Sequence, residues 1–246
     1  MLENIFGRKE KKNKSKKRLK FKNSLNNIKQ FLNHLKSLNN FKLLNIIIHP
    51  SYFPSISHYV AMANSDLVTF EMDDNFQKQT NRNRMYIYSP NGIQLLNVPI
   101  KHSKTVHQKT KDVQIENDFD WQKQHFKSLE AAYRSSPFFE YFEDTIHPVF
   151  EKKHQFLMDL NLQTMEIVSN CLGFEFDYNE TTEYFFDVAD KTDFRPLVNG
   201  KKDVSQLASY TQVFGDKHGF INNLSILDLL FNEGRYAFEY LKQQQL

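Results

Sequence analysis

His49 occupies a position at which a side chain can take part in chemistry. It follows a run of three isoleucines, residues 46–48, and precedes Pro50. Proline disfavours helical geometry in the residue before it, so we expect His49 at the end of a strand, facing a loop. There an imidazole can act as a general base or, when protonated, bind an anion near neutral pH. The alternative is a histidine that only holds its own loop, in which Tyr52 either orients a ligand or packs.

A dense polar segment, residues 73–84, follows the next apolar run and begins with the carboxylates Asp73 and Asp74. Carboxylates can ligate a divalent metal, bind a sugar hydroxyl or support proton transfer. Neighbouring side chains on a strand point to opposite faces, so these two should not share one task. We assign Asp74 to catalysis beside His49 and Asp73 to substrate binding, and we predict no metal site. A turn with one capping aspartate is the alternative.

Three cations and an amide complete this segment, namely Lys78, Arg82, Asn83 and Arg84. Such cations suit a phosphate or a carboxylate, because arginine offers paired hydrogen bonds and lysine a compact charge. We therefore predict that these four side chains bind an anionic small-molecule substrate, a sugar nucleotide or an amino-acid donor. The alternative is internal ion pairing with the carboxylates of residues 71–74. The sequence identifies no cofactor.

The elements around these residues should bring them together. We expect a strand over residues 45–49, a helix over 56–64 and a strand over 67–72. A strand, a short crossover helix and a second strand form a parallel pair with a right-handed connection. Ligands in open sheets of this kind bind beyond the carboxyl ends of the strands. The histidine and the aspartate pair should therefore line one crevice.

The remaining chain predicts a hairpin and then helices, so the fold class is mixed α/β. Strands over residues 85–89 and 93–98 flank a Pro-Asn-Gly turn, and residues 112–116 form a further strand. Asp120 should cap a helix that buries one face, and Pro137 should open the next helix. One or two longer helices cover residues 148–172, and two more lie near residues 224–230 and 235–242. Residues 174–215 lack periodicity and are predicted to be irregular.

The net charge of +3 hides an uneven distribution. Residues 1–45 hold 13 Lys and Arg against 2 Asp and Glu, whereas the remaining residues hold 19 against 27. We predict that residues 1–44 form a basic extension, partly disordered or an amphipathic helix, and that residues 45–246 form one domain. Such an extension can contact an anionic membrane surface, or it is dispensable. The acidic body argues against specific nucleic-acid binding.

Other features exclude several classes of protein. The only cysteine, Cys171, excludes an intrachain disulfide and a multi-cysteine zinc site, and we interpret it as a core thiol. No apolar run approaches the roughly 20 residues of a membrane span, and no secretory signal is present, so we expect a cytoplasmic protein. No glycine-rich phosphate loop occurs, so side chains would have to hold any phosphate.

Four blocks of the sequence, spread over about residues 46–234, resemble the WbqC-like protein family. These blocks read HPSYFPSISHYVAMANSDLVTFEMDDNFQKQTNRNR, LLNVPIKH, DWQKQHFKSLEAAYRSSPFFEYF and NLSILDLLFNEG. The resemblance implies work on a precursor of O-antigen or another surface polysaccharide, such as transfer of glycine or another acyl group to an amino sugar. It supplies no catalytic residue.

Three functions are consistent with these observations. The leading one is a transferase acting on a sugar nucleotide or a similar anionic precursor. A nucleotidyltransferase is the first alternative, because His49 and Ser57-His58 resemble the paired histidines of such enzymes, although the spacing is long and the usual glycine is missing. The second alternative is a ligand-binding or scaffold protein without catalytic activity.

Overall fold

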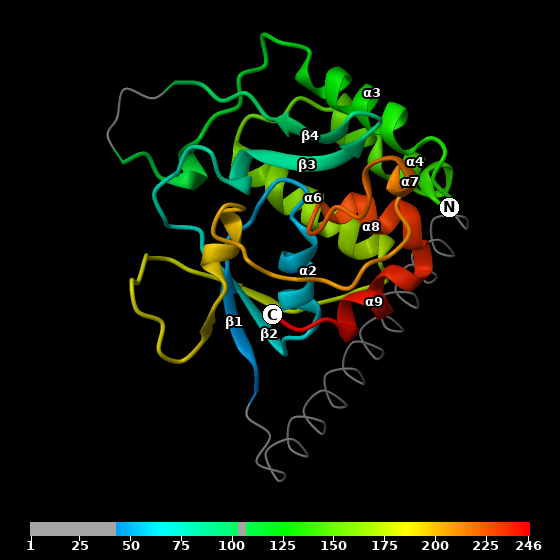
Figure 1. The fold of residues 1–246 in the computed structure, drawn as a ribbon. Helices are drawn as coiled ribbons and strands as arrows, with labels where there is room; N and C mark the ends of the chain where they lie inside the picture. The colour runs from blue at the N-terminus through cyan, green and yellow to red at the C-terminus, as the bar shows by residue number, and fades with distance from the viewer. Residues whose placement is uncertain (1–42, 103–106) are drawn as a thin grey trace, which may run out of the picture. The chain divides into compact units, whose positions relative to one another are not determined.

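A parallel pair of strands opens the fold of the computed structural model, which describes residues 43–102 and 107–246 (Figure 1). Strands β1 (Asn45–Ile48) and β2 (Leu67–Phe70) pair with Ile46 opposite Val68. Helix α2 (Ile56–Ala63) makes the crossover between them. The predicted β-α-β start is confirmed. The basic extension predicted for residues 1–44 lies outside the described residues, except for its last two positions.

Two further parallel strands complete this sheet from a distant part of the chain. They are β5 (Tyr178–Glu180), which pairs with β2, and β6 (Thr192–Asp193), which pairs with β1. The resulting order is β5-β2-β1-β6. The chain therefore builds outward on one side of β1 and then returns to its other side, which makes β1/β6 the topological switch point. The prediction of irregular structure for residues 174–215 is wrong for these two strands.

A separate antiparallel hairpin follows the polar segment. It consists of β3 (Arg84–Ser89) and β4 (Gly92–Asn97), and Gly92 closes its turn with a φ of 94°. The mixed α/β class is confirmed, with the hairpin as a second sheet of its own. The strand predicted over residues 112–116 is wrong. That segment begins in the 3-10 turn η2 (Thr110–Asp112) and joins its neighbours only through single bridges at Gln114 and Ile115.

Helices fill most of the second half, as predicted. They are α3 (Trp121–Tyr133), α4 (Phe139–Ile146), α5 (Pro148–Glu151), α6 (Leu157–Cys171), α7 (Gly215–His218), α8 (Ile226–Glu233) and α9 (Ala237–Gln243), with the 3-10 turns η3 (Arg195–Val198) and η4 (Gly234–Tyr236). A further 3-10 turn, η1 (Asn81–Asn83), comes directly before the hairpin. Asp120 precedes α3, but its side chain makes no capping hydrogen bond within the described part of the chain. Pro137 lies before α4 rather than in its first turn. Among the described residues, none of these helices combines the length and the apolar composition needed to cross a membrane.

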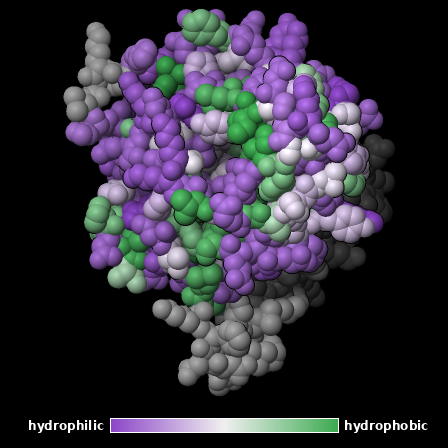
Figure 2. Space-filling view, in the orientation of Figure 1, coloured by the Kyte–Doolittle hydropathy of each residue, from purple (hydrophilic) through white to green (hydrophobic). Residues whose placement is uncertain are grey.

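The two faces of the parallel sheet have different environments. Ile46, Ile48, Val68 and Phe70 pack on one face against α2 and α6 in a small hydrophobic cluster. A larger cluster joins the hairpin to the helices. The opposite face carries the long connection from β5 to β6, which lies to the left of β1 in Figure 1. Hydrophilic residues cover much of the surface seen in Figure 2, but hydrophobic residues emerge where this connection lies.

Candidate functional site

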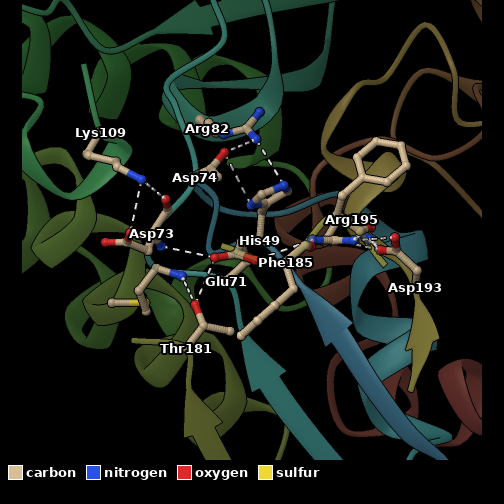
Figure 3. A network of polar contacts seen from close by, with 12 residues as sticks. His49, Glu71, Asp73, Asp74, Arg82, Lys109, Thr181, Phe185, Asp193 and Arg195 are labelled. Carbon is tan, nitrogen blue, oxygen red and sulfur yellow. Dashed lines mark hydrogen bonds and ion pairs between the residues drawn. The ribbon is translucent and has the colours of Figure 1, made fainter. Parts of the chain in front are cut away.

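Three predicted side chains meet at the carboxyl edge of the parallel sheet. His49 directly follows β1, Asp74 lies in the loop after β2, and Arg82 lies in η1. Arg82 Nη2 donates to Asp74 Oδ2 at 2.5 Å and to His49 Nε2 at 3.0 Å (Figure 3). His49 Nδ1 lies 3.6 Å from Asp74 Oδ2. The exposed fractions of His49, Asp74 and Arg82 are 6%, 4% and 1%, so water barely reaches the cluster.

Neighbouring polar groups hold Arg82 and the loop after His49 in place. Thr80 Oγ1 accepts from Arg82 Nη1 at 3.1 Å. From α6, the buried Asn161 amide donates to the carbonyl of Arg82 at 2.8 Å and to that of Pro50 at 3.3 Å. One helix therefore holds both the loop after His49 and the 3-10 turn that carries Arg82.

The hydrogen bonds determine the tautomer of His49. A guanidinium can only donate, so His49 Nε2 must accept and the ring proton lies on Nδ1, facing Asp74. Burial, together with the charge of Arg82, lowers the pKa of His49 well below its ordinary value. The imidazole is therefore neutral at pH 7. The predicted cationic role would need a charge that burial and Arg82 disfavour, whereas the proton-accepting role stays a prediction.

Three polar atoms in this cluster have no hydrogen-bond partner among the described residues. They are His49 Nδ1, Asp74 Oδ1 and Arg82 Nε, and all three are fully buried. Buried polar atoms are nearly always paired with protein groups or ordered water. One unpaired acceptor and two unpaired donors in the same cluster indicate that a polar ligand or water completes it.

A second buried pair, Glu71 and Arg195, lies beside the first. Glu71 Oε2 is 3.4 Å from Arg195 Nη1, and Glu71 is 0% exposed. Glu71 Oε1 accepts from the Asp73 amide at 3.0 Å and from Thr181 Oγ1 at 2.8 Å. The guanidinium of Arg195 also donates two hydrogen bonds to the Asp193 carboxylate, at 2.8 and 2.9 Å. The sequence analysis did not assign Glu71 and Arg195 to the site, although both follow ends of strands in the sheet.

Asp73 and Asp74 have different partners, as predicted, although both lie in the loop after β2 rather than on a strand. Lys109 Nζ lies 3.0 Å from one oxygen of the Asp73 carboxylate, and Lys111 binds the other. These contacts lower the pKa of Asp73, with Lys111 the largest cause. Asp73 therefore joins the loop after β2 to the segment around η2. The structure does not bring it to the buried cluster.

Four other predicted residues also lie outside this cluster. Tyr52 is fully buried, and its hydroxyl is 3.0 Å from His125 Nδ1 in the hydrophobic core. The Asn83 amide donates to the Val98 carbonyl at 2.9 Å and so ties η1 to the end of the hairpin. Lys78 is exposed, and Arg84 is half-buried at the start of β3. The substrate-binding roles of these residues stay predictions.

A chain of buried hydroxyls leads from the first turn of α2 towards the surface. His58 Nδ1 is 3.1 Å from Ser55 Oγ, which is 2.9 Å from Ser57 Oγ, and Ser57 Oγ donates to Asp203 Oδ2 at 2.5 Å. Burial lowers the pKa of His58 to about 4. The charge of Arg82 also lowers this pKa, and His58 in turn lowers that of His49. The predicted pair of histidines is therefore electrostatically connected.

Metal ligation and cysteine chemistry gain no support from the geometry. Within residues 43–102 and 107–246, no three His, Cys, Asp or Glu side chains are grouped so as to hold a metal ion. Cys171 is half-buried, and burial raises the pKa of its thiol to about 11. A thiol with this pKa is a poor nucleophile at pH 7, in agreement with the predicted core role.

Comparison with known proteins agrees with the resemblance seen in the sequence. The chain is similar to the uncharacterised protein Rv1507c of Mycobacterium tuberculosis, with 26% identity over 226 residues, which are 80% of this chain and 96% of that protein. No solved structure matches the chain significantly. The sequence pattern of the WbqC-like protein family matches residues 49–199, which include His49, Asp74, Arg82 and Arg195. Since this match spans more than half of the sequence, the chain belongs to the WbqC-like protein family.

Proposed function

We propose that this protein is a transferase that acts in the cytoplasm on an anionic precursor of a surface polysaccharide. The observation that carries the proposal is the buried cluster of His49, Asp74 and Arg82 at the carboxyl edge of the sheet. Ligands of open parallel sheets bind at this edge. The unpaired Arg82 Nε supports an anion as the ligand, because a guanidinium binds phosphate or carboxylate through two parallel hydrogen bonds.

The arrangement suggests how binding and proton transfer are linked. When the anion draws the guanidinium of Arg82, His49 Nε2 loses its hydrogen bond and becomes available as a base. It then accepts the proton of the attacking amine or hydroxyl while that group bonds to the transferred acyl carbon and the leaving group departs with its electron pair. Asp74, which faces Nδ1, stabilises the imidazolium that forms. Without the anion, Arg82 holds the base inactive.

The test begins with a ligand screen by thermal shift of the full chain against sugar nucleotides, amino acids and ATP. A ligand present at 100 times its dissociation constant stabilises a protein by about 2.7 kcal/mol, which is easily measured. Products formed from the ligands that raise the midpoint are then identified by mass spectrometry. His49→Gln should keep the midpoint shift but lose turnover, whereas Arg82→Lys should lose both.

Lys127→Ala provides the control, because Lys127 is exposed on α3 and remote in sequence from the cluster. It should leave binding and turnover unchanged. If His49→Gln and Arg82→Lys both retain full turnover while folded, this assignment is refuted. If ligands bind but no product forms with any pair of donor and acceptor, the alternative of a ligand-binding protein without catalytic activity is favoured.

Nucleotidyl transfer is a second candidate, and the strand order favours it. The order β5-β2-β1-β6 puts His49 at a topological switch point, the usual nucleotide site of such sheets. His58, in the first turn of the helix after β1, is electrostatically connected to His49. The full chain should then release pyrophosphate from a nucleoside triphosphate when a phosphorylated sugar is present. No release with any acceptor would dismiss this candidate.

The basic sequence of residues 1–44 leads to a separate proposal, that of peripheral contact with an anionic membrane. Attraction between lysines and anionic lipids is screened by salt. The full chain should therefore sediment with vesicles of anionic phospholipid at low salt and be released at high salt. No sedimentation at either salt concentration would contradict the proposal.

A further inference from the structure

A pocket of about 260 Å³ lies on the face of the parallel sheet that the helices leave uncovered. Side chains of β1 and β2 form its floor, and the connection between β5 and β6 forms its walls. Its lining includes Thr69, Glu71, Glu180, Thr181, Glu183 and Phe185. Figure 3 shows Glu71 between Thr181 and Arg195, close to His49. The pocket and the His49–Asp74–Arg82 cluster are therefore neighbours.

The hydroxyl of Thr69 indicates that the pocket takes a polar occupant. Thr69 is 4% exposed, and its Oγ1 has no hydrogen-bond partner anywhere in the described ranges. It lies on the same face of β2 as Glu71, since side chains two residues apart on a strand point the same way. Leaving a buried hydroxyl unpaired destabilises a folded protein, because the group loses its hydrogen bonds to water and gains none in return. A ligand that bonds to Thr69 removes this penalty.

The charges of the walls indicate which chemistry the ligand brings. Glu71, Glu180 and Glu183 contribute carboxylates, whereas Lys191 contributes a single cation to the lining. Carboxylates only accept hydrogen bonds, so the ligand must supply donors, which means hydroxyl or ammonium groups. A phosphate or a carboxylate would be repelled.

An exposed aromatic ring adds an apolar contact to this polar lining. Phe185 lines the pocket with an exposed fraction of 53%. The Phe185 carbonyl accepts a hydrogen bond from Arg195 Nη1 at 2.7 Å, and the same nitrogen contacts Glu71 at the end of β2. Arg195 therefore fixes the backbone at Phe185 to the sheet. Sugar rings have apolar C–H faces and edges of hydroxyls, and this combination matches an aromatic wall above a floor of acceptors.

The volume of the pocket limits the size of the ligand. Sites for drug-sized molecules usually measure about 300–1,000 Å³, so a pocket of about 260 Å³ suits a single ring rather than a whole nucleotide. We propose that this pocket binds one sugar ring, neutral or carrying an ammonium group. Resting on the proposed transferase function, this sugar is the acceptor, and its nucleophilic group points towards His49.

Isothermal titration of the full chain with glucose, glucosamine and N-acetylglucosamine tests the inference, with inorganic phosphate as the anionic comparison. At least one sugar should bind with a dissociation constant in the millimolar range or below, and phosphate should not compete with it. Thr69→Val should weaken this binding by about threefold to tenfold, the effect of one hydrogen bond, while leaving folding stability equal or higher. Phe185→Leu should weaken it as well.

Matched controls separate the pocket from general effects of substitution. Thr110→Val also removes a buried hydroxyl that lacks a partner among the described residues, but Thr110 does not line the pocket. Phe119→Leu removes an aromatic ring that is 63% exposed. Both variants should bind the sugar as the unsubstituted chain does.

The outcomes also separate this inference from the proposed transferase function. If a sugar binds, Thr69→Val weakens it and no transfer occurs with any donor, the pocket assignment stands and the transferase proposal falls. If no sugar binds, or if Thr69→Val and Thr110→Val have equal effects, the pocket assignment is overturned. Transfer to an acceptor other than a sugar would then leave the transferase proposal intact.

Discussion

Replacing Asp74 by alanine should destabilise this protein far more than replacing Arg82. The Asp74→Ala variant leaves a guanidinium that is 1% exposed, with only Thr80 and the neutral His49 to accept its hydrogen bonds. An arginine cannot escape this situation by losing its proton. Breaking a buried ion pair in this way destabilises a protein by about 3–5 kcal/mol, a large part of the 5–15 kcal/mol that keeps a typical domain folded.

Arg82→Met leaves a different residual charge. The Asp74 carboxylate remains, but the Nδ1–H of His49 lies 3.6 Å away, and the ring can take up a second proton on Nε2, which Arg82 no longer occupies, and pair with Asp74 as an imidazolium. Loss of the Arg82 charge removes the second largest cause of the lowered His49 pKa, so this pKa should rise. We expect Arg82→Met to lower the free energy of unfolding by about 1–3 kcal/mol. The double variant, Asp74→Ala with Arg82→Met, should have a free energy of unfolding within about 1–2 kcal/mol of that of the unsubstituted chain.

Urea unfolding at pH 7, monitored by circular dichroism, measures the free energy of unfolding of the three variants. NMR titration of the His49 ring measures its pKa. Glu143→Ala is the control, because Glu143 pairs with Arg134 at the surface, where such a pair contributes at most about 1 kcal/mol. A destabilisation below about 1 kcal/mol for Asp74→Ala would refute the buried pair. A double variant no more stable than Asp74→Ala would refute the coupling between the two charges.

Three further predictions follow from single residues. Burial lowers the pKa of His58 from 6.5 to about 4, so the unfolded chain takes up a proton first as the pH falls, and the free energy of unfolding should decrease by about 3 kcal/mol between pH 6.5 and 4, that is, over 2.5 pH units at 1.36 kcal/mol each. His58→Gln should reduce this loss of stability at acid pH when it is measured by urea unfolding, and an unchanged loss would contradict the role of His58. Gly234→Ala should destabilise by about 2–4 kcal/mol in the same assay, because φ is 54° and the added Cβ would lie 2.5 Å from the Phe138 ring; a neutral effect would count against this contact. Cys171, with a thiol pKa of about 11, should react with iodoacetamide at pH 8 on the order of a hundredfold more slowly than free cysteine, and rapid labelling would show that the thiol is not buried.

The part of the fold that the sequence predicted is the part encoded locally. The run of isoleucines, the short helix and the next apolar run follow one another within about 25 residues, so periodicity and the crossover rule sufficed. Strands β5 and β6 have three and two residues, and every one of their side chains is exposed. These two strands form because β1 and β2 offer unpaired edges. The residues of β5 and β6 themselves contain no pattern that predicts a strand.

The candidate site likewise contains residues that the sequence predicted and residues that it did not. His49, Asp74 and Arg82 could be named because strand ends and a charged segment are visible in the sequence. Arg195 could not, since its place in the site depends on β6. For Tyr52 the sequence left ligand binding and loop packing both open. Its ring is buried, and its hydroxyl lies 3.0 Å from Nδ1 of His125, which is more than 70 residues away and could not be identified as its neighbour from local patterns.

The strand order has a consequence for synthesis on the ribosome. β1 and β2 leave the exit tunnel early, yet the strands that cover their two outer edges lie more than 100 residues later in the chain. Domains assembled from such distant pairings fold slowly, and bare edges invite pairing with other chains. A nascent polypeptide that ends within α6 would hold a two-stranded core open on both sides, so chaperone capture should be strongest during that interval of translation.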